Sequence, residues 1–257
     1  MTEPKNKKKE DRLKRAGAVL LALALWQLAA MLVKEELLLV SPIKVLLRLT
    51  ELIAEKGFWS SVAFSLIRIA AGFFLGLAAG FMLSFLAYRF SLLEILLWPF
   101  VTLMRSVPLA SFIILALMLF SSARLSVFIS FLMVFPLAYG NLLEGLKTSD
   151  PALLEMASVY HLSAGRRFAY IYWPHIKAFF LASCTAGLGL AWKSGIAAEV
   201  IGIPDGSIGE RLYEAKIYLA TADLLAWTLV IIFLSMAFEK LFVLLIRILN
   251  RKWEEKA

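Results

Sequence analysis

The sequence predicts an all-α membrane protein with six transmembrane helices, and three observations support this fold class. Of the 257 residues, 61% are hydrophobic and 18% are charged, whereas soluble domains contain about half apolar and about a quarter charged residues. The apolar residues are gathered in blocks about as long as a bilayer crossing. Most basic residues lie between these blocks, and the one cysteine, Cys184, excludes an internal disulfide.

The apolar blocks can be counted directly, because a helix needs about 20 apolar residues to cross the hydrocarbon layer. Four runs without charges have 18 to 20 residues, namely Ala16–Val33, Ile69–Tyr88, Ser106–Ala123 and Leu125–Leu143. The third run continues backwards through Ile95–Met104, interrupted by Arg105. Two further blocks contain isolated charges, Ala178–Ile203 and Leu224–Ile246. We therefore predict six spans.

The lysine and arginine residues outside the spans indicate the orientation. With a cytoplasmic N-terminus, sixteen of them lie inside and seven outside, and such an excess marks the cytoplasmic side. We predict that both termini are cytoplasmic, and we interpret the net charge of +8 as a topology signal, so that no nucleic-acid partner is expected.

This topology divides the chain into segments. They are a basic cytoplasmic N-terminus (1–15), a first span (16–33), an external loop (34–61), a membrane core (62–250) and a cytoplasmic tail (251–257). Within the external loop, Val45–Ala54 is amphipathic and predicts a short surface helix.

Small residues at helical spacing predict close helix packing in two spans. In the second span, Gly72, Gly76 and Gly80 stand four residues apart, and the missing side chains let another helix approach until the backbones touch. The fifth span has a similar row around Gly187. We predict helix contacts at these positions, either within one chain or between two chains.

The stretch 144–176 is polar enough to leave the membrane on the cytoplasmic side. Asp150 followed by Pro151 is typical of a helix start, because the carboxylate caps free amides and proline fits the first turn. Ser163 can cap a second short helix, and we expect Pro174 to end or kink that helix before the next span. The stretch therefore predicts a helix–turn–helix at the cytoplasmic surface.

This loop resembles the EAA loop of ABC importer permeases. Glu155, Ala157, Ile171 and Pro174 stand at matching positions, and Phe168 stands where phenylalanine is common. Three positions depart from the pattern, namely Met156 for alanine, His161 for glycine and Trp173 for leucine.

Short motifs outside the loop resemble the nitrate/sulfonate/taurine type of these permeases. Together with the loop they cover roughly residues 60–250. The motifs are Ser65–Arg68, Gly72-Phe73, Arg105–Pro108, Ala191–Lys193 and Ala197–Val200.

The resemblance implies a type I ABC importer (MetI-like) permease fold in a bacterial inner membrane, with 62–250 as the permease core and a cytoplasmic coupling helix. That helix would dock on a separate ATPase that holds ATP and Mg²⁺, so that no cofactor or metal is expected in this chain. The other implied partners are a second copy of the chain, a second ATPase subunit, an external substrate-binding protein and the lipid bilayer. The residues implied in ATPase coupling are Leu154, Glu155, Ala157, Val159, His161, Ile171 and Pro174. The alternative for the loop is a solvated amphipathic connector.

Charged residues within the predicted spans are candidates for the translocation path or its gate, because ionisable groups are costly in lipid. Arg105 lies three residues before Pro108, which permits a bend. Arg105 could attract an anionic substrate or pair with Glu199 as part of a gate; the alternative is a structural ion pair or a snorkelling side chain. We place Glu199 near the outer end of its span, and for both Lys193 and Glu199 structural pairing is the alternative.

The sequence offers no motif for catalysis. It lacks G-x-x-x-x-G-K-[ST], H-E-x-x-H and G-x-S-x-G, so that phosphate cradling, zinc hydrolysis and a nucleophile elbow have no sequence support. We predict a transport permease without enzymatic activity. The resemblance implies that it carries a small anionic or small organic nutrient, such as nitrate, a sulfonate or a vitamin precursor. The alternatives are an ion-coupled secondary transporter and a membrane-embedded enzyme.

Overall fold

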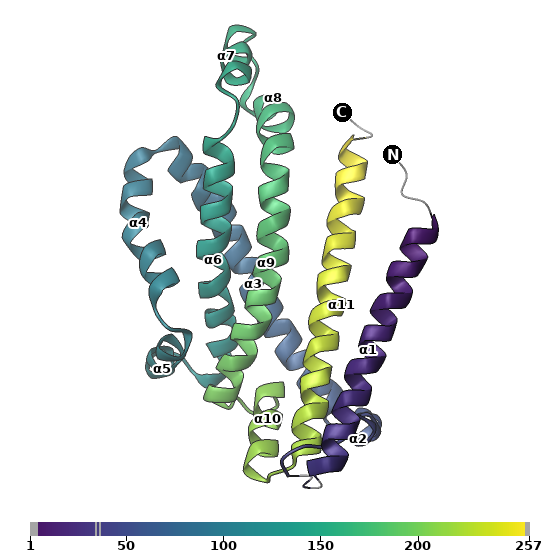
Figure 1. The fold of residues 1–257 in the computed structure, drawn as a ribbon. Coiled ribbons are helices and arrows are strands. Elements are labelled where there is room, and N and C mark those ends of the chain that lie inside the picture. Colours follow the sequence, from purple (N-terminus) through teal and green to yellow (C-terminus); the bar gives the residue numbers. More distant parts are fainter. Residues whose placement is uncertain (1–4, 34, 36, 255–257) are drawn as a thin grey trace. The chain divides into compact units, whose positions relative to one another are not determined.

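The computed structural model describes residues 5–33, 35 and 37–254, and within these the chain forms helices joined by short turns, with no strand (Figure 1). Residues 1–4 and 255–257, in the predicted N-terminal segment and tail, and 34 and 36, in the predicted external loop, lie outside the described residues. The chain divides into two compact units. The first contains the part up to Trp59 together with Arg211–Val230, and the second contains Ser60–Glu210 and the part from Ile231 onwards.

Four of the described helices are long and apolar enough to cross a membrane. They are α1 (Lys5–Val33), α3 (Phe58–Arg89), α6 (Ser122–Lys147) and α11 (Thr221–Glu254), and they cover the first, second, fourth and sixth predicted spans.

The fifth predicted span lies in α9 (Trp173–Gly202), which is long enough at 30 residues but contains no 18-residue stretch as apolar as those of the four helices. Lys193 and Glu199 account for part of this difference, because each charge lowers the hydropathy of the helix. The count of six spans stays a prediction.

The third predicted span is not one helix. The chain forms α4 (Ser91–Ser106) and α5 (Leu109–Leu119), which are bent by 110° at the break between them. Val107 and Pro108 have extended ψ angles of 135° and 133° at this break. Because a proline ring disfavours the helical conformation of the residue before it, the bend that Pro108 permits is here a break between two helices.

The bent pair α4–α5 runs back along α6. The Lys147 ammonium in the last turn of α6 lies 2.6 Å from the Glu94 carboxylate in the first turn of α4. Near the other end of α6, Ile113 and Ala116 of α5 form one buried cluster with Leu125. The pair therefore returns the chain along the length of α6, as a single broken crossing does.

Short elements connect the long helices. Between α6 and α9 the chain forms α7 (Pro151–Val159), α8 (Ala164–Arg167) and the π-helix η1 (Phe168–Tyr172), and α10 (Ile208–Ile217) follows α9. In Figure 1, α7 projects beyond the ends of α6 and α9, while α5 lies near the opposite end of α6.

The glycine row of α3 lies against α6. A Cβ atom at Gly76 would lie 2.9 Å from Val134 Cβ, one at Gly80 would lie 2.6 Å from Ala138 Cβ, and Gly72 equally faces backbone atoms of α6. These separations are shorter than van der Waals contact, so the two helices can approach this closely only at glycine. The contact positions advance in the same order along both helices, which therefore run in the same direction. The packing lies within one chain, which decides between the two alternatives left by the sequence.

α9 packs against the same helix in the opposite direction. A Cβ atom at Gly187 would lie 3.4 Å from Val134 Cγ1, and one at Gly202 would lie 2.6 Å from Leu125 Cδ2. As the chain advances along α9, its contacts move back along α6. Helices α3, α6 and α9 thus form the centre of the second unit.

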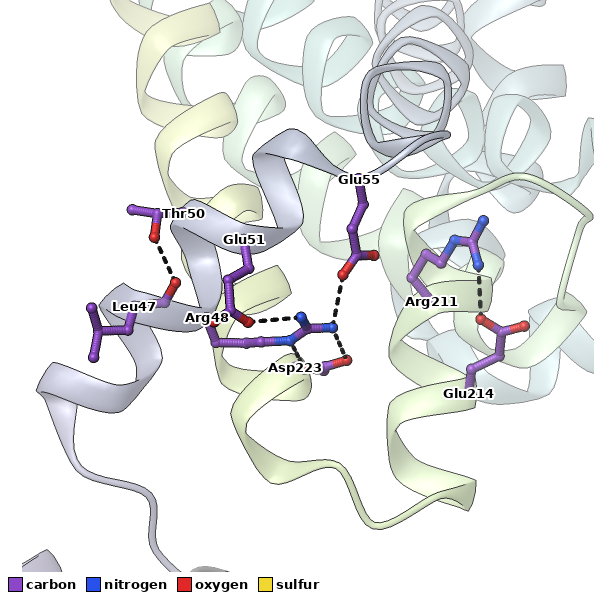
Figure 2. Close-up of polar contacts among 8 residues, drawn as sticks. All are labelled: Leu47, Arg48, Thr50, Glu51, Glu55, Arg211, Glu214 and Asp223. Carbon is purple, nitrogen blue, oxygen red and sulfur yellow. Dashed lines mark hydrogen bonds and ion pairs between the residues drawn. The ribbon is translucent and has the colours of Figure 1, made fainter.

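The first unit contains α2 (Pro42–Ala54), which covers the predicted amphipathic stretch. The Ser41 hydroxyl accepts a hydrogen bond from the Lys44 amide at the start of this helix. From α2, the Arg48 guanidinium donates hydrogen bonds to both carboxylate oxygens of Asp223, in the first turn of α11 (Figure 2). The pKa of Arg48 is raised above its ordinary value, mainly by the hydrogen bonds to Asp223. This ion pair ties α2 to the start of α11.

We expect Gly80→Ala to destabilise the protein by about 1–3 kcal/mol through overpacking. The added Cβ would lie 2.6 Å from Ala138 Cβ and 2.8 Å from Tyr139 N, and neither atom can move without shifting α6. Thermal unfolding in detergent, followed by circular dichroism, measures the effect. Gly189→Ala in α9 is the control, because its added Cβ would meet no atom of another helix within 4 Å. Equal unfolding temperatures for the two variants would contradict the close contact of α3 with α6.

We expect Arg48→Lys to loosen α2, by about 1–2 kcal/mol, because an ammonium group cannot bind both oxygens of Asp223 at once. Arg48 is 28% exposed and its partner is 27% exposed, so water screens the pair only partly. Arg211→Lys is the matched control, since Arg211 pairs with Glu214 on the exposed surface of one helix (Figure 2). Hydrogen exchange of the Pro42–Ala54 amides should accelerate in the first variant and stay unchanged in the second. Equal exchange in both would show that the pair does not hold α2.

Candidate functional site

α7 begins at a capped N-terminus in the loop that the sequence singles out. The Ala152 amide donates a hydrogen bond to Asp150 Oδ1 at 2.9 Å, and Pro151 occupies the first turn. Such a cap satisfies one of the free amides at a helix start. The residues that predicted this start therefore form it.

The turn after α7 is left-handed. His161 has a φ of 51°, and the Leu162 amide donates a hydrogen bond to the Ala157 carbonyl at 2.9 Å. Glycine adopts this conformation without strain, whereas a residue with a Cβ atom does so at a cost. The chain keeps the turn although His161 replaces the glycine of the EAA pattern.

Two residues that we expected to take part in ATPase coupling are buried within the chain. Ala157 is 0% exposed and Ile171 is 8% exposed. In this conformation both side chains are covered by other parts of the protein. Their part in ATPase coupling stays a prediction.

The outer side of α7 exposes large apolar side chains, and we call these four residues the α7 face. They are exposed by 44 to 74%, and they are Leu153, Met156, Val159 and Tyr160. Glu155 is also exposed, and Leu154 is half-buried. Of the four, only Val159 is among the residues that the resemblance implies in ATPase coupling. The helical spacing of the other three could have identified them, because residues three and seven apart share one side of a helix.

The return from α7 is a continuous helical path, and Pro174 does not end it. Helices α8, η1 and α9 follow one another directly, and Pro174 stands in the first turn of α9. The Trp173 amide donates to the Phe168 carbonyl five residues earlier, and this wider π turn accommodates a proline that has no amide to donate. Ser163 precedes α8 as expected, but its side chain makes no capping hydrogen bond.

Aromatic contacts attach η1 to the end of α3. The ring centres of Phe168 and Phe85 lie 5.5 Å apart, and those of Tyr172 and Tyr88 lie 5.8 Å apart. Burial, followed by a hydrogen bond with Tyr88, raises the pKa of Tyr172 to about 12. Because an unfolded tyrosine has a pKa of about 10, neutral Tyr172 stabilises the fold below about pH 10, and this contribution is lost as the pH rises towards 12.

Glu199 in α9 is fully buried and holds the segment that follows its own helix. Ser65 of α3 donates a hydrogen bond to Glu199 Oε2 at 2.6 Å, and its oxygen accepts one from the Ile208 amide at 2.9 Å. The Gly209 amide also donates to Glu199 Oε2, at 3.4 Å. Because Ile208 and Gly209 begin α10, Glu199 and Ser65 together cap that helix.

The second oxygen of Glu199 is enclosed as well. Oε1 is buried and neighbours the buried hydroxyl of Ser126. Arg68 is near enough to attract the carboxylate, but it donates its own hydrogen bond to the Ala123 carbonyl at 2.6 Å. In this conformation Glu199 is enclosed and its partners lie within the chain.

Arg105 and Glu199 do not form the pair that we considered as a gate. Arg105 donates a hydrogen bond from Nη2 to the Pro136 carbonyl of α6 at 2.6 Å, and its guanidinium lies over Gly140. Glu199 is held by α3 and the start of α10, as described above. Arg105 is exposed, whereas Glu199 is buried.

The other predicted path residues, Pro108 and Lys193, are also exposed. Pro108 stands directly before α5 at the break. Lys193 is exposed on α9, although Trp192 and Ser194 on either side of it are buried. Within the described part of the chain, no group of three or more His, Cys, Asp or Glu residues could hold a metal ion.

The loop pattern and the packed helices agree with a known protein family. The family model for the binding-protein-dependent transport system inner membrane component matches residues 58–255. The chain belongs to this family. Its members are membrane permease subunits of ABC transporters, which work with an ATPase and a substrate-binding protein. The protein is therefore a multi-pass permease of a bacterial membrane.

Several relatives of this permease have names that state a substrate. The putative aliphatic sulfonates transport permease SsuC of Bacillus subtilis is 28% identical over 233 residues, which cover 90% of this chain and 82% of the relative. The taurine transport system permease TauC of Escherichia coli is 26% identical over 83% of this chain and 80% of its own. A probable ABC transporter permease of Brucella abortus is 27% identical over 84% and 86%. Others are named as permeases for nitrate, bicarbonate and formylaminopyrimidine.

We expect Ser65→Ala to destabilise the permease by about 2–4 kcal/mol, because the change leaves both the Glu199 carboxylate and the Ile208 amide short of a partner in a buried place. Ser84→Ala is the control, since Ser84 is equally buried in α3 but bonds only to the Phe81 carbonyl of its own helix. Thermal unfolding measures the stability, and hydrogen exchange at Ile208 and Gly209 measures the cap. If the two variants behave alike, Ser65 does not hold α10.

Proposed function

We propose that this permease forms the translocation path of an ATP-driven importer and takes up a small anionic nutrient. Two copies of the chain would enclose the path, two ATPase subunits would bind and hydrolyse ATP with Mg²⁺, and an external binding protein would deliver the substrate. The chain itself would carry out no chemical step. It would bind the solute briefly and open the translocation path first to one side of the membrane and then to the other.

The observation that carries this proposal is the α7 face. A surface in contact with water rarely exposes several large apolar side chains side by side. Such a group on one short capped helix is typical of a surface that binds another protein. α7 holds three such side chains and Tyr160 directly after it a fourth, beside the exposed Glu155. We infer that the α7 face inserts into a groove of the ATPase and that Glu155 forms a charge contact at its rim.

The direction of the helices supports a topology with six spans and both termini in the cytoplasm. α3 and α6 run in the same direction and α4–α5 returns between them, as the second to fourth spans of that topology require. α9 runs opposite to α6 and would supply the fifth span. The excess of basic residues supports a cytoplasmic position for α7, on the side where ATP is available.

The names of the relatives support a small anion as the substrate. Sulfonates, taurine, nitrate and bicarbonate each carry an anionic group, whereas formylaminopyrimidine does not. An anion is also the solute for which an exposed arginine in a membrane span has an evident use. We therefore propose a sulfonate, nitrate or bicarbonate as the substrate.

We expect Val159→Asp and Glu155→Lys each to weaken binding of the ATPase by at least about tenfold, because the first puts a charge into an apolar contact and the second reverses a rim charge. Co-purification of the ATPase with the tagged permease measures the loss. Glu35→Lys makes the same charge change at an exposed position of the predicted external loop, and it should leave the complex intact. Full retention of the ATPase by both α7 variants would refute docking through α7.

A further inference from the structure

α6 holds the Arg105 guanidinium in a seat made of Pro136 and Gly140. Arg105 Nη2 donates a hydrogen bond to the Pro136 carbonyl at 2.6 Å. A Cβ atom at Gly140 would collide with this same nitrogen. The glycine thus leaves open the space that the guanidinium occupies, and any other residue there would push the arginine away. We call Pro136 and Gly140 the Arg105 seat.

The Arg105 seat lies near the middle of a membrane crossing. At a rise of about 1.5 Å per residue, Pro136 lies about 20 Å from the first residue of α6 and about 17 Å from the last. α6 is one of the helices long and apolar enough to span the bilayer. Arg105 is also the second residue before the break between α4 and α5, so the charge stands where the crossing is interrupted.

The seat uses only part of the guanidinium. Arg105 is exposed, and no described residue accepts a hydrogen bond from its Nε or Nη1. Charged groups at this depth face a bundle interior or a water-filled cavity, because free donors in lipid are costly. An arginine that is fixed through one nitrogen and open at the others is ready to bind a second acceptor.

We propose that Arg105 binds the transported solute midway through the membrane and that the solute is an oxyanion. The planar guanidinium can bind two oxygens of a sulfonate, nitrate or bicarbonate side by side, which an ammonium cannot do. The Arg105 seat holds the group in place before the solute arrives, which lowers the ordering cost of binding. This inference rests on the proposed function as an importer, and it adds the residue that selects the charge of the solute.

The test is uptake into proteoliposomes that contain the permease with its ATPase subunits and its binding protein. The probes are radiolabelled taurine, ethanesulfonate, nitrate and bicarbonate, with formylaminopyrimidine as the probe without an anionic group. We expect the wild type to import at least one anion and Arg105→Gln to import it at least about tenfold more slowly, while ATP hydrolysis stimulated by the binding protein continues. Arg105→Lys should fall between them.

Gly140→Ala tests the seat without removing the charge, because its Cβ would take the place of Nη2. We expect it to slow anion uptake as Arg105→Gln does. Gly189→Ala, which has open space for its Cβ, and Arg124→Gln, which removes an exposed charge at the start of α6, are the controls and should import at the wild-type rate.

Each other outcome overturns the inference in a different way. Wild-type anion uptake that Arg105→Gln and Gly140→Ala leave unchanged removes Arg105 from the path but keeps the importer. Import of formylaminopyrimidine alone refutes an oxyanion as the solute. If Arg105→Gln lowers the unfolding temperature and abolishes ATP hydrolysis as well as uptake, then Arg105 serves only to hold α4 against α6. A wild type that imports no probe overturns the proposed substrate class itself.

Discussion

The close approach of α3, α6 and α9 is the constraint on which the second unit depends. Apolar surface gives little net gain between helices in lipid, so that their association relies on van der Waals contact and on hydrogen bonds between helices. The glycines of α3 and α9 remove the side chains that would keep α6 away. At this distance the Ser130 hydroxyl of α6 reaches the Ala191 carbonyl of α9, at 3.1 Å, and Gly195 leaves room for it. Close packing thus makes the polar contacts possible.

The isolation of Glu199 follows from the same packing. A buried carboxylate is tolerated where donors are fixed around it, and here they come from α3 and from the first residues of α10. Ser65 serves both sides, because it donates to the carboxylate and accepts from Ile208. If α3 moved away from α9, the carboxylate and the Ile208 amide would both lose Ser65, the partner that they share. The loop after α9 is therefore coupled to the spacing of the helices.

The sequence could predict elements whose cause is local. The apolar blocks predicted the long helices, Asp150 and Pro151 predicted the start of α7, and the row of glycines predicted a close contact of α3. It could not predict which helix α3 meets, because that depends on how the chain returns between Arg89 and Ser122.

The two proline predictions show the same limit. Pro108 stands at a break between two helices where we expected that a bend was possible, and Pro174 does not end the helical path where we expected an end or a kink. A proline lacks the amide that would donate a helical hydrogen bond in both places. The conformation of the neighbouring turn decides whether the helix continues without that bond. At Pro174 the helical path continues through the π turn of η1, and at Pro108 the chain changes direction. Likewise Arg105 and Glu199 have other partners in this structure, the Pro136 carbonyl and the Ser65 hydroxyl, which no sequence spacing reveals.

The connections of α7 explain how a partner on its face could act at the Arg105 seat. The loop leaves α6 and returns to α9, and at its base Thr148 Oγ1 lies 3.2 Å from His175 Nε2, which joins the ends of both helices. A displacement of α7 therefore reaches α6 directly, through a short capped turn. Pro136 and Gly140 belong to α6, whereas Arg105 belongs to α4, so any sliding of one helix along the other changes the contact between the guanidinium and its seat. In the proposed transport cycle this geometry gives ATPase closure a mechanical route to the residue that would hold the solute, without requiring the buried Glu199 to move out of its enclosed place.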